Sequence, residues 1–247
     1  MLIALFTDIH SNRQAFTTCL ARARGAGAQQ IVLLGDYVGY GADPEWTVNT
    51  VMELVDRGAL AVRGNHDTAV GDSSEMTMNT AAEVAVEWTR RQLGAAERRF
   101  LKQLPLTRED ADRLYVHADA SDPTRWRYVL DALGAERSMA ATNAHLTFCG
   151  HCHQPALYSM SATGKMTAFT PTTGSPVQIL PDQRWLAVLG SVGQPRDGNP
   201  AAAYALFDTD RRELTYCRAA YDVAEAAARI RNKGLPDWLA DRLLTGQ

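Results

Sequence analysis

The chain has little of what marks secreted or membrane proteins. It contains only four cysteines, and no apolar run approaches the ~18–20 residues that span a bilayer. The first strand-like residues meet an acid at Asp8 without the basic segment of a signal peptide. These absences predict a protein of the reducing cytoplasm with no membrane partner.

An excess of positive charge is also missing. Lys and Arg number 25 against 28 Asp and Glu, which gives a net charge of −3 and a pI of about 6.1. This balance argues against broad binding of nucleic acid, although a local basic pocket stays open. Apolar residues make up 46% of the 247 residues, so a large core can form without disulfides or a structural metal. We find no low-complexity tract and no internal repeat.

The first part of the chain alternates between short apolar runs and helical patterns. We expect strands at 2–6, 31–34 and 59–62, with helices over 15–23 and 43–55 between them. This βαβαβ order is typical of a parallel sheet with right-handed crossovers.

The rest of the chain mixes helices with many short strands. Two helices are expected over 79–104, where they are a candidate lid, and helical patterns fill most of 124–143 and then 222–244. Further strands are expected at 106–108, 113–116, 146–148, 158–161, 165–169, 177–180, 185–189, 203–207 and 214–217. No Pro/Gly/Ser-rich linker interrupts this order. We therefore expect one domain over 1–247, of mixed α/β and α+β class, with two stacked sheets.

Residues that can bind a metal follow five of the expected strands. These are Asp8-Ile9-His10, Gly35-Asp36, Gly64-Asn65-His66-Asp67, His117 and Gly150-His151-Cys152-His153. Five of the six histidines fall at these positions, and only His145 does not. Histidines placed for packing would rarely cluster in this way.

The types of donor atom restrict which metal ions we expect to bind. Carboxylate and amide oxygens mixed with imidazoles suit Mn, Fe, Zn, Ni or Co rather than a calcium cage or a thiolate zinc knuckle. Because there are more donors than one ion can use, we expect two ions with a bridging carboxylate. Such a pair activates a bridging water for in-line attack, which indicates hydrolysis of a phosphoester.

The ordered set Asp8-x-His10, Gly35-Asp36, Gly64-Asn65-His66-Asp67, His117 and Gly150-His151-x-His153, with the later Gly190–Asp197 segment, resembles the calcineurin-like metallophosphoesterase family, in its bacterial single-domain branch. The resemblance implies a metal-dependent hydrolase. It also implies a four-layer α-β-β-α sandwich in which helices flank two stacked β-sheets. Ala118 and Val188-Leu189 depart from common family residues, but none of them occupies a ligand position.

The resemblance implies a role for each motif residue. The first metal would be held by Asp8, His10 and His153, the second by Asn65, His117 and His151, with Asp36 bridging the two. His66 would protonate the leaving-group oxygen or stabilise charge on the phosphate, and Asp67 would orient its imidazole. Candidate substrate contacts are Asn12, Tyr40 and Arg196.

The resemblance leaves the substrate open. We favour a phosphorylated small molecule or nucleotide, cleaved by a phosphodiesterase or by a nucleotide or dinucleoside-polyphosphate phosphatase. The alternatives are a phosphomonoesterase or phosphoprotein phosphatase, and a catalytically silent metal-binding scaffold on the same fold. A redox role for Cys149-x-x-Cys152 is disfavoured, because the residues after it do not predict the helix that activates such thiols.

Overall fold

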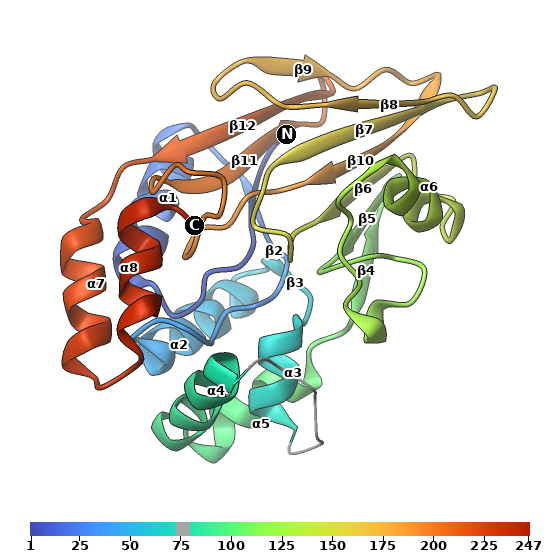
Figure 1. Ribbon diagram of the computed structural model, residues 1–247. Coiled ribbons are helices and arrows are strands. Elements are labelled where there is room, and N and C mark those ends of the chain that lie inside the picture. Colours follow the sequence, from blue (N-terminus) through green and yellow to red (C-terminus); the bar gives the residue numbers. More distant parts are fainter. Residues whose placement is uncertain (73–79) are drawn as a thin grey trace.

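The computed structural model describes residues 1–72 and 80–247, and two six-stranded sheets dominate it (Figure 1). The first sheet has the order β3 (Leu60–Ala61), β2 (Gln30–Leu33), β1 (Leu2–Phe6), β11 (Ala202–Asp208), β12 (Glu213–Ala219) and β9 (Pro176–Gln178). Strands β1, β2 and β3 run parallel, as the βαβαβ pattern predicted, and β11 joins β1 antiparallel.

The second sheet is built from the later strands. Its order is β4 (Thr107–Asp110), β5 (Arg113–Val116), β6 (Leu146–Cys149), β10 (Gln183–Val188), β7 (Ala156–Ser161) and β8 (Met166–Phe169). Strands β5, β6 and β10 are parallel, and the remaining pairs are antiparallel. The C-terminal ends of the parallel strands of a sheet meet at one edge, which is where an α/β fold gathers its functional loops.

Strand β1 lies between two hydrophobic layers, because alternate side chains point to opposite faces. Ile3 and Leu5 join the core between the sheets, and Ala4 and Phe6 join the core under the helices. This explains why the strand reads as an unbroken apolar run rather than an alternating one.

Aromatic contact ties the two sheets together. Phe148 of β6 meets Phe207 of β11 edge to face, with ring centroids 5.7 Å apart, and Tyr115 stacks on Phe148 in the same core.

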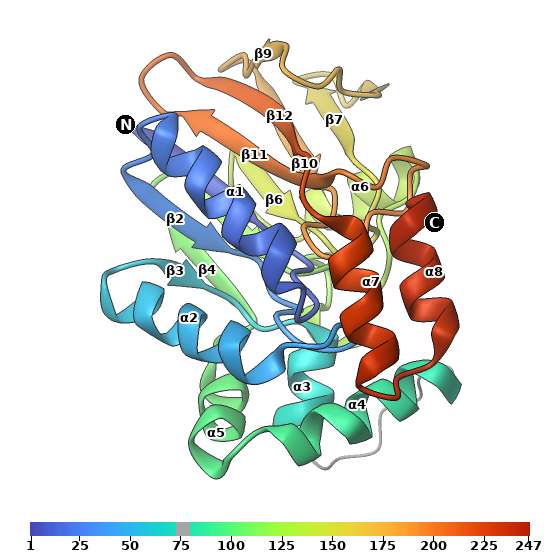
Figure 2. The ribbon, with the colours of Figure 1, turned by 90° about the vertical axis from the view of Figure 1, so that its left-hand side faces the viewer.

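Helices cover the outer face of each sheet. On the first sheet, α1 (Arg13–Gly25) and α2 (Pro44–Asp56) bury their apolar sides against β1 and β2 (Figure 2). On the second, α6 (Ala132–Ala140) buries Ala135 and Met139 against the sheet. The expected four-layer α-β-β-α arrangement of stacked sheets and flanking helices is confirmed.

The C-terminal helices α7 (Val223–Asn232) and α8 (Asp237–Thr245) form an antiparallel pair beside α1 (Figure 2). Their apolar cluster includes Ile230, Leu239 and Leu243, and also Tyr40 from the loop after β2. The pair therefore packs against the loops that follow the first sheet.

The helices after β3 also match the prediction in outline. Helices α4 (Thr80–Gln92) and α5 (Ala95–Gln103) cover most of the 79–104 stretch, whose first residue lies outside the described residues. Val86, Leu93 and Leu101 pack in one cluster with α2, so the two helices rest on the body of the protein. The lid stays a prediction.

One local expectation was wrong. The 124–143 region contains only the short 3-10 turn Pro123–Arg125 and α6, because Asp131 caps the N-terminus of α6 by accepting from Gly134 N and so ends the loop there. The residues after β3 also open a short helix that was not predicted, α3 (Asn65–Gly71). In the described part of the chain no helix is long and apolar enough to cross a membrane.

Candidate metal centre

The expected ligands converge on the edge where the parallel strands of both sheets end. Asp8 and His10 follow β1, Asp36 follows β2, and His117 follows β5. The remaining expected ligands are Asn65 after β3 and the pair His151 and His153 after β6. The histidines and aspartates among them are all buried.

The backbone of these loops is strained. Five of the expected ligands have positive φ angles, namely Asp8 (53°), His10 (47°), Asp36 (53°), His151 (66°) and His153 (60°). A left-handed conformation costs about 1–3 kcal/mol for a residue other than glycine, and it persists where the surroundings impose it. The strain turns side chains from neighbouring loops toward one point, as expected for a functional site.

Close packing of glycines explains part of this geometry. A Cβ on Gly64 would lie 2.2 Å from Oδ1 of Asp36, and one on Gly193 would lie 1.8 Å from the carbonyl oxygen of Ile9. Only glycine lets these loops approach one another so closely.

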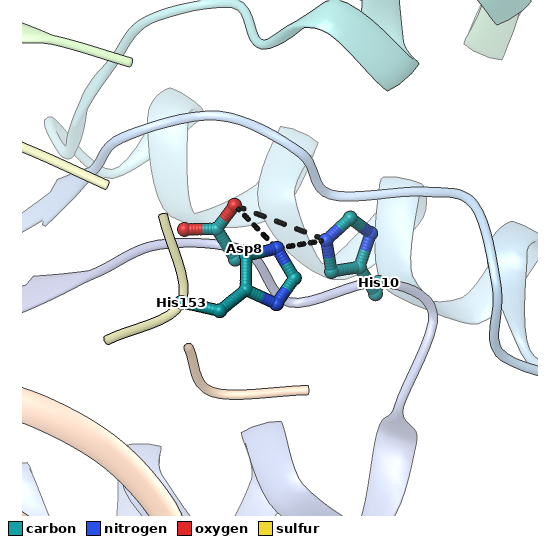
Figure 3. Close-up of side chains that lie close together, drawn as sticks. All are labelled: Asp8, His10 and His153. Atoms are coloured by element: carbon teal, nitrogen blue, oxygen red, sulfur yellow. Dashed lines mark hydrogen bonds and ion pairs between the residues drawn. The ribbon is translucent and has the colours of Figure 1, made fainter. Parts of the chain in front are cut away.

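The first donor cluster consists of Asp8, His10 and His153 (Figure 3). The Nε2 atoms of the two histidines are 3.1 Å apart, and Oδ1 of Asp8 lies 3.2 Å from His153 Nε2 and 3.8 Å from His10 Nε2. All three side chains point toward one another in Figure 3.

The second cluster is built around His117. Its Nε2 lies 3.2 Å from Asn65 Oδ1, 3.2 Å from His151 Nδ1 and 3.3 Å from Asp36 Oδ2. The same Oδ2 of Asp36 lies 3.8 Å from His10 Nε2 in the first cluster. Asp36 thus stands between the two groups, as its expected bridging position requires.

Hydrogen bonds to carbonyl groups fix the tautomers of three histidines. Nδ1 of His10 donates to the Val38 carbonyl (3.0 Å), that of His117 to Leu34 (2.7 Å), and that of His153 to Gln194 (2.6 Å). In the neutral ring this leaves Nε2 with a lone pair that faces the donor cluster. Backbone partners of this kind commonly orient metal-binding imidazoles.

The donors fit a cation. The facing Nε2 lone pairs of His10 and His153 repel each other unless a positive charge lies between them. Oδ1 of Asp8 is buried without a hydrogen-bond partner, while its Oδ2 accepts from Thr7 Oγ1 at 2.8 Å and from His151 N at 2.9 Å. Because a buried carboxylate oxygen is costly to leave unpaired, these atoms match the needs of a metal ion.

The pKa values of the carboxylates reflect the same crowding. Burial opposes ionisation of Asp8 and Asp36, yet the adjacent histidines, chiefly His153 for Asp8 and His117 for Asp36, hold both pKa values below the usual range. Both side chains therefore stay anionic, as metal ligands must.

The histidines respond to burial and to charge. Burial lowers the pKa of His117, but the Asp36 carboxylate outweighs it and raises the pKa to about 9. Burial lowers the pKa of His10, and it lowers that of His151 to about 3, with the charge of His117 acting in the same direction. Of these three histidines, His117 is therefore the one that favours a positive charge, and this charge lies beside Asp36.

Comparison with known proteins agrees with this geometry. The family model of the calcineurin-like phosphoesterase superfamily domain matches residues 1–212. The chain belongs to this superfamily. Membership indicates a metal-dependent phosphoester hydrolase acting on phosphorylated substrates, and the two donor clusters are where this phosphoesterase could bind divalent ions.

Individual proteins resemble the phosphoesterase over its full length. An uncharacterized protein of Methanocaldococcus jannaschii is 33% identical, over 100% of this chain and 98% of that protein. The crystal structure of a metallophosphoesterase from Sphaerobacter thermophilus is also 33% identical, covers 100% of both chains and superposes with a TM-score of 0.87. A hypothetical protein of Pyrococcus horikoshii shares the fold, with 17% identity, 100% and 98% coverage and a TM-score of 0.80.

His66 lies beside the first donor cluster, in the first turn of α3. Its ring meets that of Tyr40 at a centroid distance of 4.5 Å and that of His10 at 5.0 Å. Its Nδ1 has no hydrogen-bond partner, and a Cβ on Gly39 would lie 2.5 Å from it. His66 also lies close enough to His10 and Asp36 to share a metal with them, so distance alone does not separate a ligand from a proton donor.

Asp67 does not make the contact that was expected. Its carboxylate accepts hydrogen bonds from the backbone N–H groups of Asp36 (2.8 Å), Tyr37 (2.9 Å) and Gly64 (2.9 Å), rather than from His66 Nδ1. Burial and the charge of Asp36 raise the pKa of Asp67 to about 7, against the N–H donors that lower it. Asp67 thus joins α3 to the loop that carries Asp36.

Asn12 is also placed differently. It caps α1, because its Oδ1 accepts from Ala15 N at 3.1 Å, and its Nδ2 donates to the Gly193 carbonyl and to Tyr221 Oη. The amide group is thereby hydrogen-bonded within the protein, and its contact with substrate stays a prediction. The sequence pattern at Asn12 indicates a helix cap equally well.

The other two candidate substrate contacts lie at the rim. The Tyr40 ring is 4.6 Å from that of His10, and the guanidinium carbon of Arg196 is 5.7 Å from the Tyr40 ring centroid. Both side chains therefore border the first donor cluster, although their substrate role stays a prediction.

Two aromatic residues border the second donor cluster. Tyr128 stacks on His151 with ring centroids 4.3 Å apart and is 48% exposed, and Trp126 meets the His117 ring edge to face at 5.9 Å. Residue spacing along the chain could not predict that these two rings lie so close to the histidines.

The cysteines of Cys149-x-x-Cys152 are both buried free thiols. Burial raises the pKa of Cys149 and raises that of Cys152 to about 12. A thiol of this kind is unreactive at neutral pH, which agrees with the expectation against a redox role.

Proposed function

We propose that this protein is a dinuclear metal-dependent phosphoesterase of the cytoplasm. The observation that carries the proposal is the position of Asp36 Oδ2, which lies 3.8 Å from His10 Nε2 and 3.3 Å from His117 Nε2. One carboxylate oxygen between two groups of donors supports two neighbouring ions rather than one.

Each ion would have its own set of donors. Asp8, His10 and His153 would hold one, and Asn65, His117 and His151 the other, with Asp36 shared. Bound there, the two ions supply positive charge for the scissile phosphate and an activated water. Available metal in the cell selects among Mn, Fe, Zn, Ni and Co, since this donor set suits them all.

His66 would handle the proton of the leaving group. Its backbone N–H donates to Oδ1 of Asp36 at 2.8 Å, so the residue keeps a fixed place beside the shared carboxylate. The ring lies between Tyr40 and His10, with its Nδ1 unpaired. It can therefore give a proton to an alcohol oxygen that departs from a phosphate above the first cluster.

The rim favours a substrate with an aromatic part. Trp126 and Tyr128 extend from the second donor cluster toward solvent, and a base or aryl group can stack on such rings. We therefore favour phosphodiesters of the nucleotide type and dinucleoside polyphosphates over phosphoprotein.

The test compares two histidine variants after metal loading. His66→Ala should lower turnover of an alkyl phosphodiester, whose alkoxide leaving group needs a proton, by about 10²–10⁴-fold while two metals per chain remain, because general acid catalysis contributes about that much. His145→Ala is the matched control, since His145 bonds Arg212 and the Pro181 carbonyl away from the clusters and should keep full activity.

Other results would contradict parts of the proposal. Loss of one metal from His66→Ala would make His66 a ligand. Absence of turnover with Mn²⁺, Ni²⁺, Co²⁺ and Zn²⁺ on mono-, di- and dinucleoside phosphates would favour a silent metal-binding scaffold, and preference for monoesters would reject the phosphodiesterase assignment.

A further inference from the structure

Two arginines from distant parts of the chain lie near the rim of the first donor cluster. Arg196 belongs to the loop after β10, and its backbone N–H donates to the carbonyl of His153 at 3.2 Å. Arg242 belongs to the last turn of α8, near the C-terminus.

The side chain of Arg196 is held in a fixed relation to the metal ligands. Its Nε and one terminal nitrogen donate to Oε1 of Gln194 at 3.3 and 2.9 Å. The carbonyl of the same Gln194 accepts from Nδ1 of His153 at 2.6 Å. The guanidinium is therefore positioned by the residue that also orients a ligand.

The end of α8 that carries Arg242 lies beside the same rim, because it is fastened to the Arg196 loop. The N–H of Gly198 donates to the Gly246 carbonyl at 2.8 Å, just beyond the end of α8. Leu243, the next residue, lines a small cavity together with His10 and Tyr40. Burial and the positive charge of Arg196 both lower the pKa of Arg242, which agrees with their proximity.

Neither guanidinium is neutralised. Among the ion pairs between described residues, none includes Arg196 or Arg242, and Arg242 instead lies over the Trp238 ring at 4.9 Å. Nearby arginines differ in this respect, because Arg218 pairs with Asp197 and Arg231 pairs with Asp241. Two unpaired cations that repel each other are unfavourable until an anion joins them, and guanidinium groups match phosphate oxygens well.

We propose that Arg196 and Arg242 form a second anion site, which binds a phosphate of the substrate other than the one that is hydrolysed. The proposal rests on the proposed function, because it assumes that the metals bind the scissile phosphate. It narrows the substrate class to phosphoesters that carry at least two phosphate groups, such as nucleoside and dinucleoside polyphosphates. The C-terminal helix would then determine specificity without touching the metals.

The test measures binding, so that it does not depend on turnover. Calorimetry on the Mn²⁺-loaded full chain compares methylphosphonate, which has one phosphonate, with methylenediphosphonate, which has two. The dissociation constant of methylphosphonate is divided by that of methylenediphosphonate. This ratio should fall by on the order of tenfold in Arg242→Ala and in Arg196→Ala, because a hydrogen bond to a charged group contributes about that much. Arg242→Lys keeps the charge and should restore part of the ratio.

Arg231→Ala is the control, because Arg231 lies on the neighbouring helix α7 and is already paired with Asp241. It should keep the wild-type ratio, and chelation of the metals by the diphosphonate affects all variants alike. An unchanged ratio in Arg242→Ala would overturn the proposal, as would an equal loss of affinity for both phosphonates. If the ratio falls but no phosphoester is hydrolysed, the second anion site stands and the proposed function fails.

Discussion

The carboxylate of Asp67 offers the sharpest test of how the site is held together. It is fully buried and accepts three short hydrogen bonds, from the backbone N–H groups of Asp36, Tyr37 and Gly64 at 2.8–2.9 Å, and a longer one from Val38 N at 3.4 Å. Asp67→Ala would leave the three nearer donors buried and unpaired. At about 1–2 kcal/mol for each of these three groups, the free energy of unfolding should fall by about 3–6 kcal/mol.

The assay is urea unfolding of the metal-free protein, followed by circular dichroism. Asp222→Ala provides the comparison, because Asp222 caps α7 through a single hydrogen bond to Glu225 N at 2.8 Å and its loss should cost about 1 kcal/mol. In a second measurement, the Asp67→Ala protein should bind metal about 10–100-fold more weakly, since the loop that carries Asp36 loses its support.

Two results would refute this reasoning. Equal destabilisation by Asp67→Ala and Asp222→Ala would mean that the three N–H groups find other partners. Reduced turnover with unchanged stability and metal content would instead support the sequence-based expectation that Asp67 acts on the imidazole of His66.

Two further predictions concern the metals and the glycines. Asp36→Asn should lower the metal content from two ions towards none, whereas Asp8→Asn should lose one ion, as measured by elemental analysis after dialysis; equal losses would reject a shared ligand. Gly193→Ala should destabilise the fold by several kcal/mol, because its Cβ would lie 1.8 Å from the Ile9 carbonyl oxygen. Gly25→Ala, with nothing within 4 Å of its Cβ, should leave the unfolding midpoint unchanged or slightly raised.

Much of the fold could be predicted from the sequence because its helices and strands follow local patterns of apolar residues. Strand β1 is apolar along its whole length since both of its faces are buried, and helix α1 shows its core side at helical spacing. The helix at Asn65–Gly71 was missed because it begins with a glycine cap and polar residues, which carry no apolar periodicity. Residues 126–131 were predicted as helix but form a loop, because Trp126 has a left-handed φ of 51° that ends the 3-10 turn.

The site shows the same division. The candidate donors were predicted from residue type, because five histidines and several acids or amides each stand at the end of an apolar run. The roles of Asn12 and Asp67 did not follow, since a carboxylate or amide near a motif can serve the backbone as readily as a ligand. Only their hydrogen-bond partners decide between these uses.

The sequence alone therefore predicted the superfamily and the sandwich, which are confirmed, and a donor set that stays a prediction, since apolar periodicity and residue chemistry are local properties of a chain. The tertiary structure decided which carboxylate oxygen lies between the two donor clusters and which carboxylate holds a loop. Asp36 and Asp67 gain these positions from neighbours far away in the chain, because loops from both sheets meet at one edge.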